Sequence, residues 1–269
     1  MRQHQPVTAL TIAGSDSSGG AGAQADLRTF YACGVHGLSA FTAVTVQNSL
    51  GVSDFVELPP AVVAAQIEAV ADDIGIGAAK TGMLASAPIM AAVAEVVRRR
   101  AIAPFVVDPV AASQHGDPLL RPEALEVLRT QILPLASLAT PNLAEVRLLT
   151  GRVVTGRDEM DDAARAMFDL GPAAVLIKGG GLRSGDAVDV LYDGATFTEF
   201  RAPRIDTIHV HGSGDTLASA TTAALARGVP LAEAIADAKQ FVTRSVADGF
   251  PLGRGRGPVG HFWRLPAPD

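Results

Sequence analysis

The chain has 269 residues, of which 48% are apolar and 19% are charged. This composition supports a packed core and excludes a wholly disordered chain. Lysine and arginine number 22 against 28 aspartates and glutamates, which gives a net charge of −6, and the longest basic run is the triplet at 98–100. Because nucleic-acid binding needs a clustered basic face, we expect no nucleic-acid partner.

Cys33 is the only cysteine, so an intramolecular disulfide and a thiolate metal cluster are both excluded. The apolar run Val7 to Ala13 leads directly into Gly14-Ser15-Asp16 and lacks the flanks of a signal peptide. No segment approaches the ~20 apolar residues that span a bilayer. We therefore expect a cytoplasmic protein without a membrane partner.

Short β-branched runs alternate with longer stretches of helical period. Strands are predicted at 7–13, 39–47, 77–81, 104–108, 137–140 and 173–178, and helices at 20–33, 60–73, 88–100, 122–132, 143–149 and 159–170. In the second helix Val63, Ile67 and Val70 follow the i, i+4, i+7 pattern. Repeated strand and helix units predict a parallel sheet with helices on both faces.

The pattern changes in the last third of the chain. Asp193-Gly194 lies between two β-rich runs at 188–192 and 195–201, which predicts a hairpin. Helices are predicted at 213–227 and 231–247, and no linker rich in proline or glycine separates two cores. The sequence therefore predicts an α/β fold, with residues 1–269 in a single three-layer αβα domain around a mostly parallel central sheet.

The first glycine-rich loop, 14–22, joins a strand to a helix, where backbone amides favour an anion. It is not a P-loop, because Gly20 and Ala21 stand where lysine and a hydroxyl residue belong. The letters Gly20-x-Gly22-x-x-Ala25 fit a dinucleotide pattern, but Gln47 replaces the acidic residue expected about 20 residues on. A tight turn that packs a helix against a strand explains the loop equally well.

A second cluster comprises Gly212, Ser213, Gly214 and Asp215 at the entrance of the helix at 213–227. Main-chain amides at a glycine-rich helix entrance can stabilise charge on a transferring phosphoryl group. Asp215 could accept a proton from an attacking hydroxyl. The alternative is that Asp215 is there only because an acid in the first turn favours a helix.

Further polar residues follow the buried strands. Lys178, ahead of three glycines, could reach phosphate oxygens, and Asp108 also lies at a strand end, where α/β sheets place ligands. Asn142 and Glu145 are one helical turn apart and could hold a hydrated magnesium ion. The alternative for this pair is a helix cap with a glutamate at its third position.

Gln47 ends a strand of small and apolar residues, where an unpaired amide would be costly. Its amide offers one donor and one acceptor side by side, which matches an aminopyrimidine edge. Asp26 could face the same cavity or be an ordinary solvated carboxylate. Met83 could cover a flat ring or be a core methionine.

Seven motifs together resemble the hydroxymethylpyrimidine/phosphomethylpyrimidine kinases of the ribokinase-like superfamily. They are 9–26 (ALTIAGSDSSGGAGAQAD), 42–48 (TAVTVQN), 80–83 (KTGM), 107–110 (VDPV), 140–145 (TPNLAE), 178–180 (KGG) and 211–216 (HGSGDT). The resemblance extends to residues 253–259 (GRGRGPV) and so covers nearly the whole chain. It implies ATP-dependent phosphorylation of 4-amino-5-hydroxymethyl-2-methylpyrimidine and then of its monophosphate, giving the pyrophosphate used in thiamine biosynthesis.

The resemblance also implies roles for individual residues. Gln47 would bind the aminopyrimidine, surrounded by the substrate-binding residues Gly14, Asp26, Met83 and Val110. Lys178, Asn142 and Asp108 would contact ATP phosphates, Glu145 and Asp108 would organise Mg²⁺, and Gly212, Ser213 and Gly214 would form an anion hole beside the base Asp215. The resemblance favours a homodimer.

One departure from the family concerns the base. Many members carry cysteine where this chain has Asp215, the residue typical of ribokinase and many vitamin kinases. An aspartate is ionised at neutral pH, whereas a free thiol mostly is not. This supports kinase chemistry but leaves a pyridoxal kinase, or a kinase for both rings, as an alternative substrate assignment. A regulator that binds the ligand without catalysis is a more distant alternative.

Two further predictions concern a loop and three histidines. Residues 110–120 are predicted to form a mobile loop that closes over substrate. His115, His209 and His211 have no metal-ligand spacing, and turn or surface roles are expected for them.

Overall fold

The computed structural model describes residues 5–111, 120, 122–182 and 185–264. The strands are β1 (Thr8–Ser15), β2 (His36–Asn48), β3 (Gly51–Glu57), β4 (Ala78–Thr81), β5 (Phe105–Val107), β6 (Leu138–Ala139), β7 (Val175–Lys178), β8 (Ala187–Tyr192) and β9 (Phe197–Ala202). The α-helices are α1 (Gly22–Ala32), α2 (Pro60–Asp73), α3 (Ala87–Arg100), α4 (Pro122–Val127), α5 (Leu143–Thr150), α6 (Met160–Phe168), α7 (Ser213–Ala226) and α8 (Leu231–Ala247). Short helical turns are η1 (Leu128–Ile132), η2 (Leu133–Leu135), η3 (Arg157–Glu159), η4 (Gly179–Gly181) and η5 (Phe262–Arg264).

All the strands form one sheet in the order β3-β2-β1-β4-β5-β6-β7-β8-β9. Pairing is parallel from β2 through β1, β4, β5 and β6 to β7, and antiparallel where β3, β8 and β9 are added at the edges. The predicted α/β class with a mostly parallel sheet is thus confirmed. Because parallel strands point the same way, the carboxyl ends of β1, β4, β5, β6 and β7 meet at one edge.

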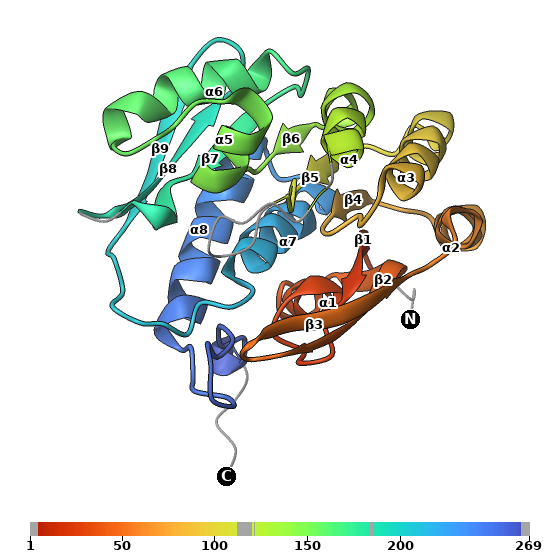
Figure 1. Ribbon diagram of the computed structural model, residues 1–269, viewed down its shortest axis with the longest axis horizontal. Helices are drawn as coiled ribbons and strands as arrows, with labels where there is room; N and C mark the ends of the chain where they lie inside the picture. Colours follow the sequence, from red (N-terminus) through yellow and green to blue (C-terminus); the bar gives the residue numbers. More distant parts are fainter. Residues whose placement is uncertain (1–4, 112–119, 121, 183–184, 265–269) are drawn as a thin grey trace.

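Helices cover both faces of the sheet (Figure 1), with α1, α7 and α8 on one face and α2 to α6 on the other. Alternate residues of a strand point to opposite faces, and β5 shows the consequence. Phe105 and Val107 join the core beneath α3, α5 and α6, whereas Val106 packs with α7 and α8. Strand β5 therefore contributes to both cores, as a central strand does in a three-layer arrangement.

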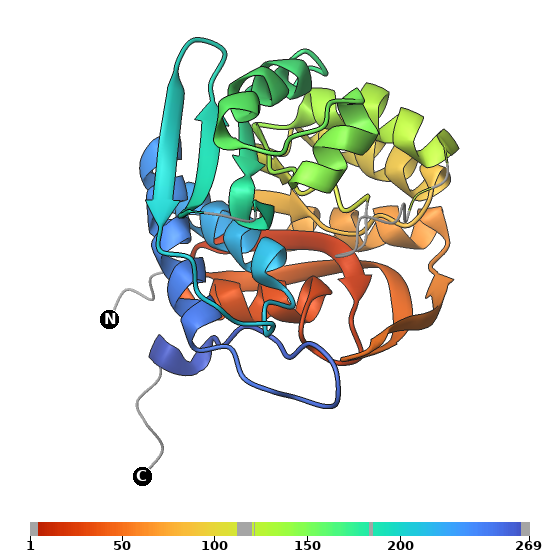
Figure 2. The same ribbon diagram turned by 60° about the vertical axis from the view of Figure 1, so that its left-hand side comes forward.

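The predicted hairpin near Asp193-Gly194 is confirmed as β8 and β9, which stand side by side at one edge of the sheet (Figure 2). The helix predicted at 122–132 is α4 followed by the wider turn η1. Strand β3 is not predicted by the sequence analysis. All its residues are exposed, so it lacks the alternation of buried and polar positions that identifies a strand.

The C-terminal segment returns to the first half of the chain. Gly255 and Arg256 donate backbone hydrogen bonds to Ser49, beyond the end of β2. His211 and Pro258 form an isolated parallel bridge. This segment thereby lies against the turn after β2 and the loop before α7. In the part of the chain that the structure describes, no helix has the length and apolar character needed to cross a membrane.

Candidate active site

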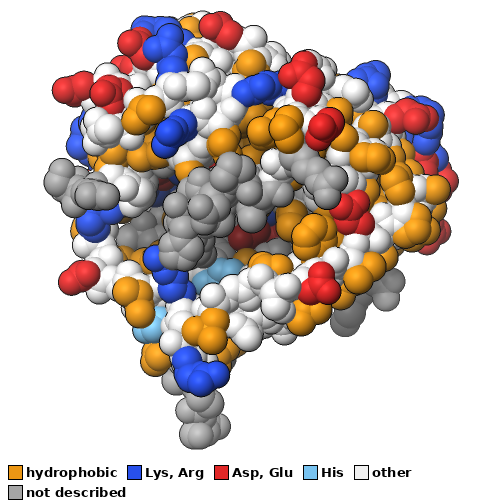
Figure 3. All heavy atoms as spheres, in the orientation of Figure 1, with side chains coloured by type: hydrophobic (Ala, Val, Ile, Leu, Met, Phe, Trp, Pro, Cys, Tyr) orange, Lys and Arg blue, Asp and Glu red, His pale blue; other side chains and the backbone are white. Residues whose placement is uncertain are grey.

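Charged side chains gather where the carboxyl ends of β4, β5 and β7 face the N-terminus of α7. Lys80 lies near the end of β4, Asp108 follows β5, Lys178 ends β7, and Asp215 is in the first turn of α7. In the view of Figure 3, acidic and histidine side chains are visible in a hollow near the middle of the face. The structure therefore brings together residues that are up to 135 positions apart, from Lys80 to Asp215.

Lys178 and Asp108 form an ion pair in this cluster. The Lys178 Nζ atom lies 2.7 Å from Asp108 Oδ1, and Thr140 donates a hydrogen bond of 3.2 Å to the same oxygen. Burial alone would lower the pKa of Lys178, but the carboxylates of Asp108, Glu145 and Asp215 outweigh it and raise the pKa. Lys178 is therefore a permanent positive charge at the end of β7, and its side chain keeps 13% exposure.

Asp215 lies between the two lysines of the site. Its Oδ1 atom is 3.9 Å from Lys80 Nζ. Burial raises the pKa of Asp215 to about 7, with Asp26 and Asp108 acting in the same direction and Lys80 and Lys178 opposing them. A group with a pKa near neutrality suits general-base chemistry, because it is available as a carboxylate and can still take up a proton.

Asn142 and Glu145 form the helix cap that the sequence analysis weighed against a magnesium site. The Asn142 side chain accepts from Glu145 N at 2.9 Å, and Glu145 Oε2 accepts from Asn142 N at 2.8 Å. Glu145 is nevertheless buried, and burial raises its pKa to about 7 against the opposing charge of Lys178. The cap fixes the carboxylate beside Lys178 and Asp108, and the two interpretations are compatible.

The entrance of α7 packs tightly against the first glycine-rich loop. Gly212 has φ +80°, and a Cβ atom there would overlap the Gly20 carbonyl oxygen. A Cβ at Gly214 would lie 3.3 Å from Lys178 Nζ. Glycine is thus required at Gly212 by backbone conformation and close approach, and at Gly214 it leaves room beside the ammonium group.

The amides of this entrance are not equivalent. Ser213 N already donates to Val210 O at 3.1 Å. Since the first N–H groups of a helix have no partner within the helix, those of Gly214 and Asp215 are available to donate to an anion. Of the residues predicted to form the anion hole, Gly212, Ser213 and Gly214, the Ser213 amide therefore already has a backbone partner, and the role of the other two stays a prediction.

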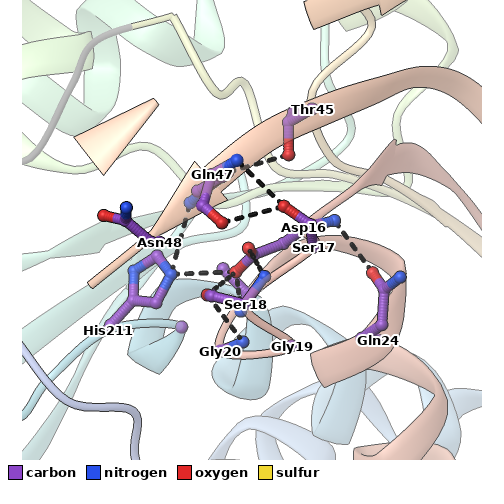
Figure 4. Close-up of polar contacts among 12 residues, drawn as sticks. Asp16, Ser17, Ser18, Gly19, Gly20, Gln24, Thr45, Gln47, Asn48 and His211 are labelled. Carbon is purple, nitrogen blue, oxygen red and sulfur yellow. Dashed lines mark hydrogen bonds and ion pairs between the residues drawn. The ribbon is translucent and has the colours of Figure 1, made fainter. Parts of the chain in front are cut away.

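A second group of polar side chains surrounds Gln47 (Figure 4). His211 Nε2 lies 3.0 Å from Asp16 Oδ2 and 3.4 Å from Gln47 Nε2, and Thr45 Oγ1 is 3.2 Å from Gln47 Oε1. Burial works against the charge of Asp16, but hydrogen bonds from His211, Ser18 and Ala21 lower its pKa below the ordinary value. The Gln47 amide is thus held half-buried at the end of β2, next to a fixed carboxylate.

Of the other expected substrate-binding residues, Gly14 and Met83 lie together and Val110 follows β5. A Cβ at Gly14 would lie 2.7 Å from Met83 Cε, so the methionine side chain covers the backbone near the end of β1. Val110 is half-buried and donates its amide to Asp108 O. Most of the loop predicted at 110–120 lies outside the described residues, as does His115.

Asp26 is not on the surface of the site. Its carboxylate is fully buried and accepts from Thr11 at 2.6 Å, Lys80 at 2.7 Å and Ser219 at 2.5 Å. The solvated carboxylate considered from the sequence is therefore wrong, whereas a place at the substrate cavity stays a prediction. The three donors engage both oxygens and fix the carboxylate inside the fold.

The sequence analysis missed Lys80 and Asp16 and gave His211 the wrong environment. A turn or surface role was expected for His211, yet its ring contacts Asp16 and Gln47 in the site. His209 Nδ1 accepts from Gly257 N, a contact across 48 residues that ties the loop before α7 to the C-terminal segment. The sequence does indicate a special role for Lys80, because a lysine inside a short strand of otherwise small residues is seldom buried without a partner.

A lysine at the end of a parallel strand and an aspartate at a glycine-rich helix entrance, on this sheet topology, define a ribokinase-like small-molecule kinase. The family model described as phosphomethylpyrimidine kinase matches residues 16–260. The chain belongs to the phosphomethylpyrimidine kinase family and is a phosphotransferase.

Two curated relatives illustrate the similarity. The hydroxymethylpyrimidine/phosphomethylpyrimidine kinase of Mycobacterium leprae is 54% identical over 260 residues, which cover 94% of this chain and 93% of that protein. A thiamine biosynthesis bifunctional protein of Geobacter sulfurreducens is 48% identical over 94% of this chain and 52% of its own length.

Two solved structures extend the comparison. The ADP complex of Bacillus subtilis pyridoxal kinase has a TM-score of 0.91 and 40% identity, covering 97% of this chain and all of that one. The phosphomethylpyrimidine kinase of Clostridium difficile has a TM-score of 0.79 and 41% identity, covering 88% and 98%. Both substrate classes considered from the sequence are thus represented among proteins of this fold.

Proposed function

We propose that this protein transfers the γ-phosphoryl group of ATP to the hydroxymethyl group of 4-amino-5-hydroxymethyl-2-methylpyrimidine, and then phosphorylates the monophosphate to the pyrophosphate for thiamine biosynthesis. The observation that carries the chemistry is the Asp215 carboxylate at the entrance of α7, 3.9 Å from a buried ammonium group and with a pKa of about 7. The relatives named above support the choice of substrate.

In the first step Asp215 accepts the proton of the substrate hydroxyl while that oxygen forms a bond to the γ-phosphorus. The bond from the γ-phosphorus to the bridging oxygen breaks and leaves ADP. Amides of Gly214 and Asp215 stabilise the charge on the phosphoryl oxygens in flight, and Lys178 neutralises the triphosphate. Phosphoryl transfer depends mainly on positioning and electrostatics of this kind.

The residues present fit a magnesium ion carried by the nucleotide. Asp108 and Glu145 are buried carboxylates that face one lysine, so the cluster has room for further positive charge. Mg²⁺ prefers a few carboxylates together with waters and phosphate oxygens. Within the described ranges no group of three or more histidine, cysteine or acidic side chains forms a complete protein site. Asp108 and Glu145 would hold the ion, which supplies charge neutralisation for the phosphates, and Asn142 would position Glu145.

The second step uses a phosphate as acceptor. Its oxygens already carry negative charge at neutral pH, so a base that removes an alcohol proton contributes little there. Asp215 therefore acts chiefly in the first step. The positive charge of Lys178 and the amides of Gly214 and Asp215 act in both.

Substrate recognition rests on Gln47. Its amide places a donor and an acceptor side by side, which complements an amino group next to a ring nitrogen. A pyridoxal ring has a phenolic oxygen and no such amino group. The Met83 side chain, folded over Gly14, supplies an apolar surface for a flat ring. These features favour the aminopyrimidine.

Pyridoxal phosphorylation is the second candidate, because the Bacillus subtilis pyridoxal kinase superposes with a TM-score of 0.91. Phosphate-product analysis after incubation with ATP and Mg²⁺ separates the two candidates. With hydroxymethylpyrimidine we expect both monophosphate and pyrophosphate, and with pyridoxal a slower reaction. Equal rates would identify a dual-substrate kinase, and binding of either ring without ADP release would indicate a regulator.

We also expect a cytoplasmic homodimer. Val44, Val46 and Val56 share one face of the β2–β3 ribbon, because Val44 pairs directly with Val56, and each is at least half exposed. An exposed apolar patch on an edge ribbon is typical of an interaction surface. Val46→Lys should convert a dimer to a monomer in sedimentation experiments, whereas Val153→Lys, an exposed valine elsewhere, should not.

A further inference from the structure

Lys80 is a charge that the reaction outlined above does not use. It lies in β4 with its side chain completely buried, although charged side chains are rarely buried without a partner. Its Nζ atom is 2.7 Å from Asp26 Oδ1 and 3.9 Å from Asp215 Oδ1. Lys80 thus stands between a carboxylate of α1 and the proposed catalytic base of α7.

Asp26 holds this lysine in place. Its Oδ2 atom accepts from Thr11 of β1, and its Oδ1 atom accepts from Ser219 of α7 as well as from Lys80. Three elements of the fold therefore converge on one carboxylate in the interior. A carboxylate fixed in this way orients the ammonium group of Lys80.

The ammonium group has hydrogen-bonding capacity to spare. It carries three N–H bonds, and among the described residues Asp26 alone lies within hydrogen-bond distance of Nζ. The next charged atom is Asp215 Oδ1 at 3.9 Å, a separation that a small side-chain rotation would close.

We propose that the Asp26–Lys80 pair is a positioning device in which Lys80 keeps the Asp215 carboxylate charged and directed at the substrate hydroxyl. This inference rests on the proposed role of Asp215 as the base. It makes Lys80 a positioning residue that acts through Asp215 and does not contact the phosphates.

The charges around Asp215 determine whether its carboxylate form is favoured. Lys80 and Lys178 favour the Asp215 carboxylate, whereas burial and the carboxylates of Asp26 and Asp108 disfavour it. In the proposed reaction Lys178 is engaged by the triphosphate, and its side chain is partly exposed for that purpose. Lys80 is then the cation that remains for the base, and its own pKa is raised because three carboxylates outweigh its burial.

The test compares Asp26→Asn with the double variant Asp26→Asn/Lys80→Met. The asparagine keeps the shape of Asp26 and removes the buried anion, so that the loss of Lys80 leaves no uncompensated carboxylate. The acidic limb of the pH profile of kcat/KM for hydroxymethylpyrimidine reports Asp215. We expect this limb one to three pH units higher in the double variant, the range for loss of an opposite charge about 4 Å away. Coincident limbs would overturn the proposal.

Two further comparisons test the proposal: one applies if the double variant does not fold, and the other tests Asp215 itself. If the double variant does not fold, Asp26→Asn is compared with the unmodified protein, and its acidic limb should lie lower because Lys80 loses its competing carboxylate. An unchanged or higher limb would contradict the proposal. The Asp215→Asn variant separates the two hypotheses. Full turnover by this variant would refute the role of Asp215 as the base. If Asp215→Asn is inactive but Asp26→Asn and the double variant have coincident acidic limbs, only the role of Lys80 is refuted.

Discussion

At the carboxyl ends of β4, β5 and β7 two lysines and two aspartates face one another. At the first glycine-rich loop His211 lies between Asp16 and Gln47, and Thr45 contacts the Gln47 amide. The charged end has capacity to spare: Lys80 has one hydrogen-bond partner among the described residues, and the pKa of Asp215 is raised to about 7. At the polar end the Asp16 carboxylate is satisfied, since it accepts from His211, Ser18 and Ala21 and its pKa is lowered. In the proposed function the charged end performs catalysis and the Gln47 amide, beside this fixed carboxylate, performs recognition.

The largest effect is expected at the charged end. Asp215→Asn keeps the shape of the side chain and removes the proton acceptor, so kcat for the hydroxymethyl substrate should fall by about 10²- to 10⁴-fold. Steady-state kinetics would measure the loss, with the thermal unfolding temperature as a control for folding. Phosphorylation of the monophosphate should be affected less, and an equal loss in both steps would assign Asp215 a role in both.

A second prediction concerns the support behind the helix entrance. The Thr216 hydroxyl donates to Gly212 O at 2.8 Å and lies 2.9 Å from His261 Nε2, and burial lowers the pKa of His261 from 6.5 to about 4. Since the Thr216 hydrogen is used by Gly212, His261 is neutral and donates from Nε2.

The lowered pKa of His261 makes the folding stability of the protein depend on pH. Between pH 6.5 and about 4 the unfolded chain binds a proton at His261 that the folded protein does not, so stability falls as the pH falls through this window. The full effect is about 3 kcal/mol. Urea unfolding at a series of pH values should show it in the unmodified protein and much less of it in His261→Asn. Identical pH dependence in both proteins would place the effect at another group.

A smaller effect is expected at the polar end. Gln47→Leu removes the donor and acceptor of the amide at nearly constant size, so KM for the aminopyrimidine should rise about 10- to 100-fold while kcat changes little. The KM for ATP is the internal control and should be unchanged. A fall in kcat at constant KM would show that Gln47 acts in the chemical step, and the contrast between the two ends would fail.

The sequence predicts most of the fold because the buried elements have strong periodic patterns. Helices α2 and α8 begin and end where the patterns at 60–73 and 231–247 place them. Strand β3 has no such pattern, because all its residues are exposed and it is held in the sheet by pairing with β2. Strand β6 has only two residues, Leu138 and Ala139, and is shorter than the strand predicted at 137–140.

The residues of the candidate site are predictable from the sequence only in part, unlike the buried elements of the fold. Lys178 and Asp108 follow from the rule that parallel strands gather ligands at their carboxyl ends, and Asp215 follows from the glycine-rich helix entrance. The structure brings the three residues close together. Contacts across long sequence separations do not follow from local patterns. His211 and Asp16 are 195 residues apart, and Lys80 and Asp26 are 54 apart. The roles of Asp26 and His211 depend on these partners, which local patterns do not reveal.

The difference between the two ends is tested most directly by the equilibrium binding of hydroxymethylpyrimidine to the Asp215→Asn variant, measured by calorimetry. If the charged end performs the chemistry and the polar end performs recognition, the variant binds the substrate with a dissociation constant within a few-fold of the unmodified protein and does not turn it over. Loss of binding in proportion to the loss of turnover would contradict this division, because Asp215 would then be needed to hold the substrate.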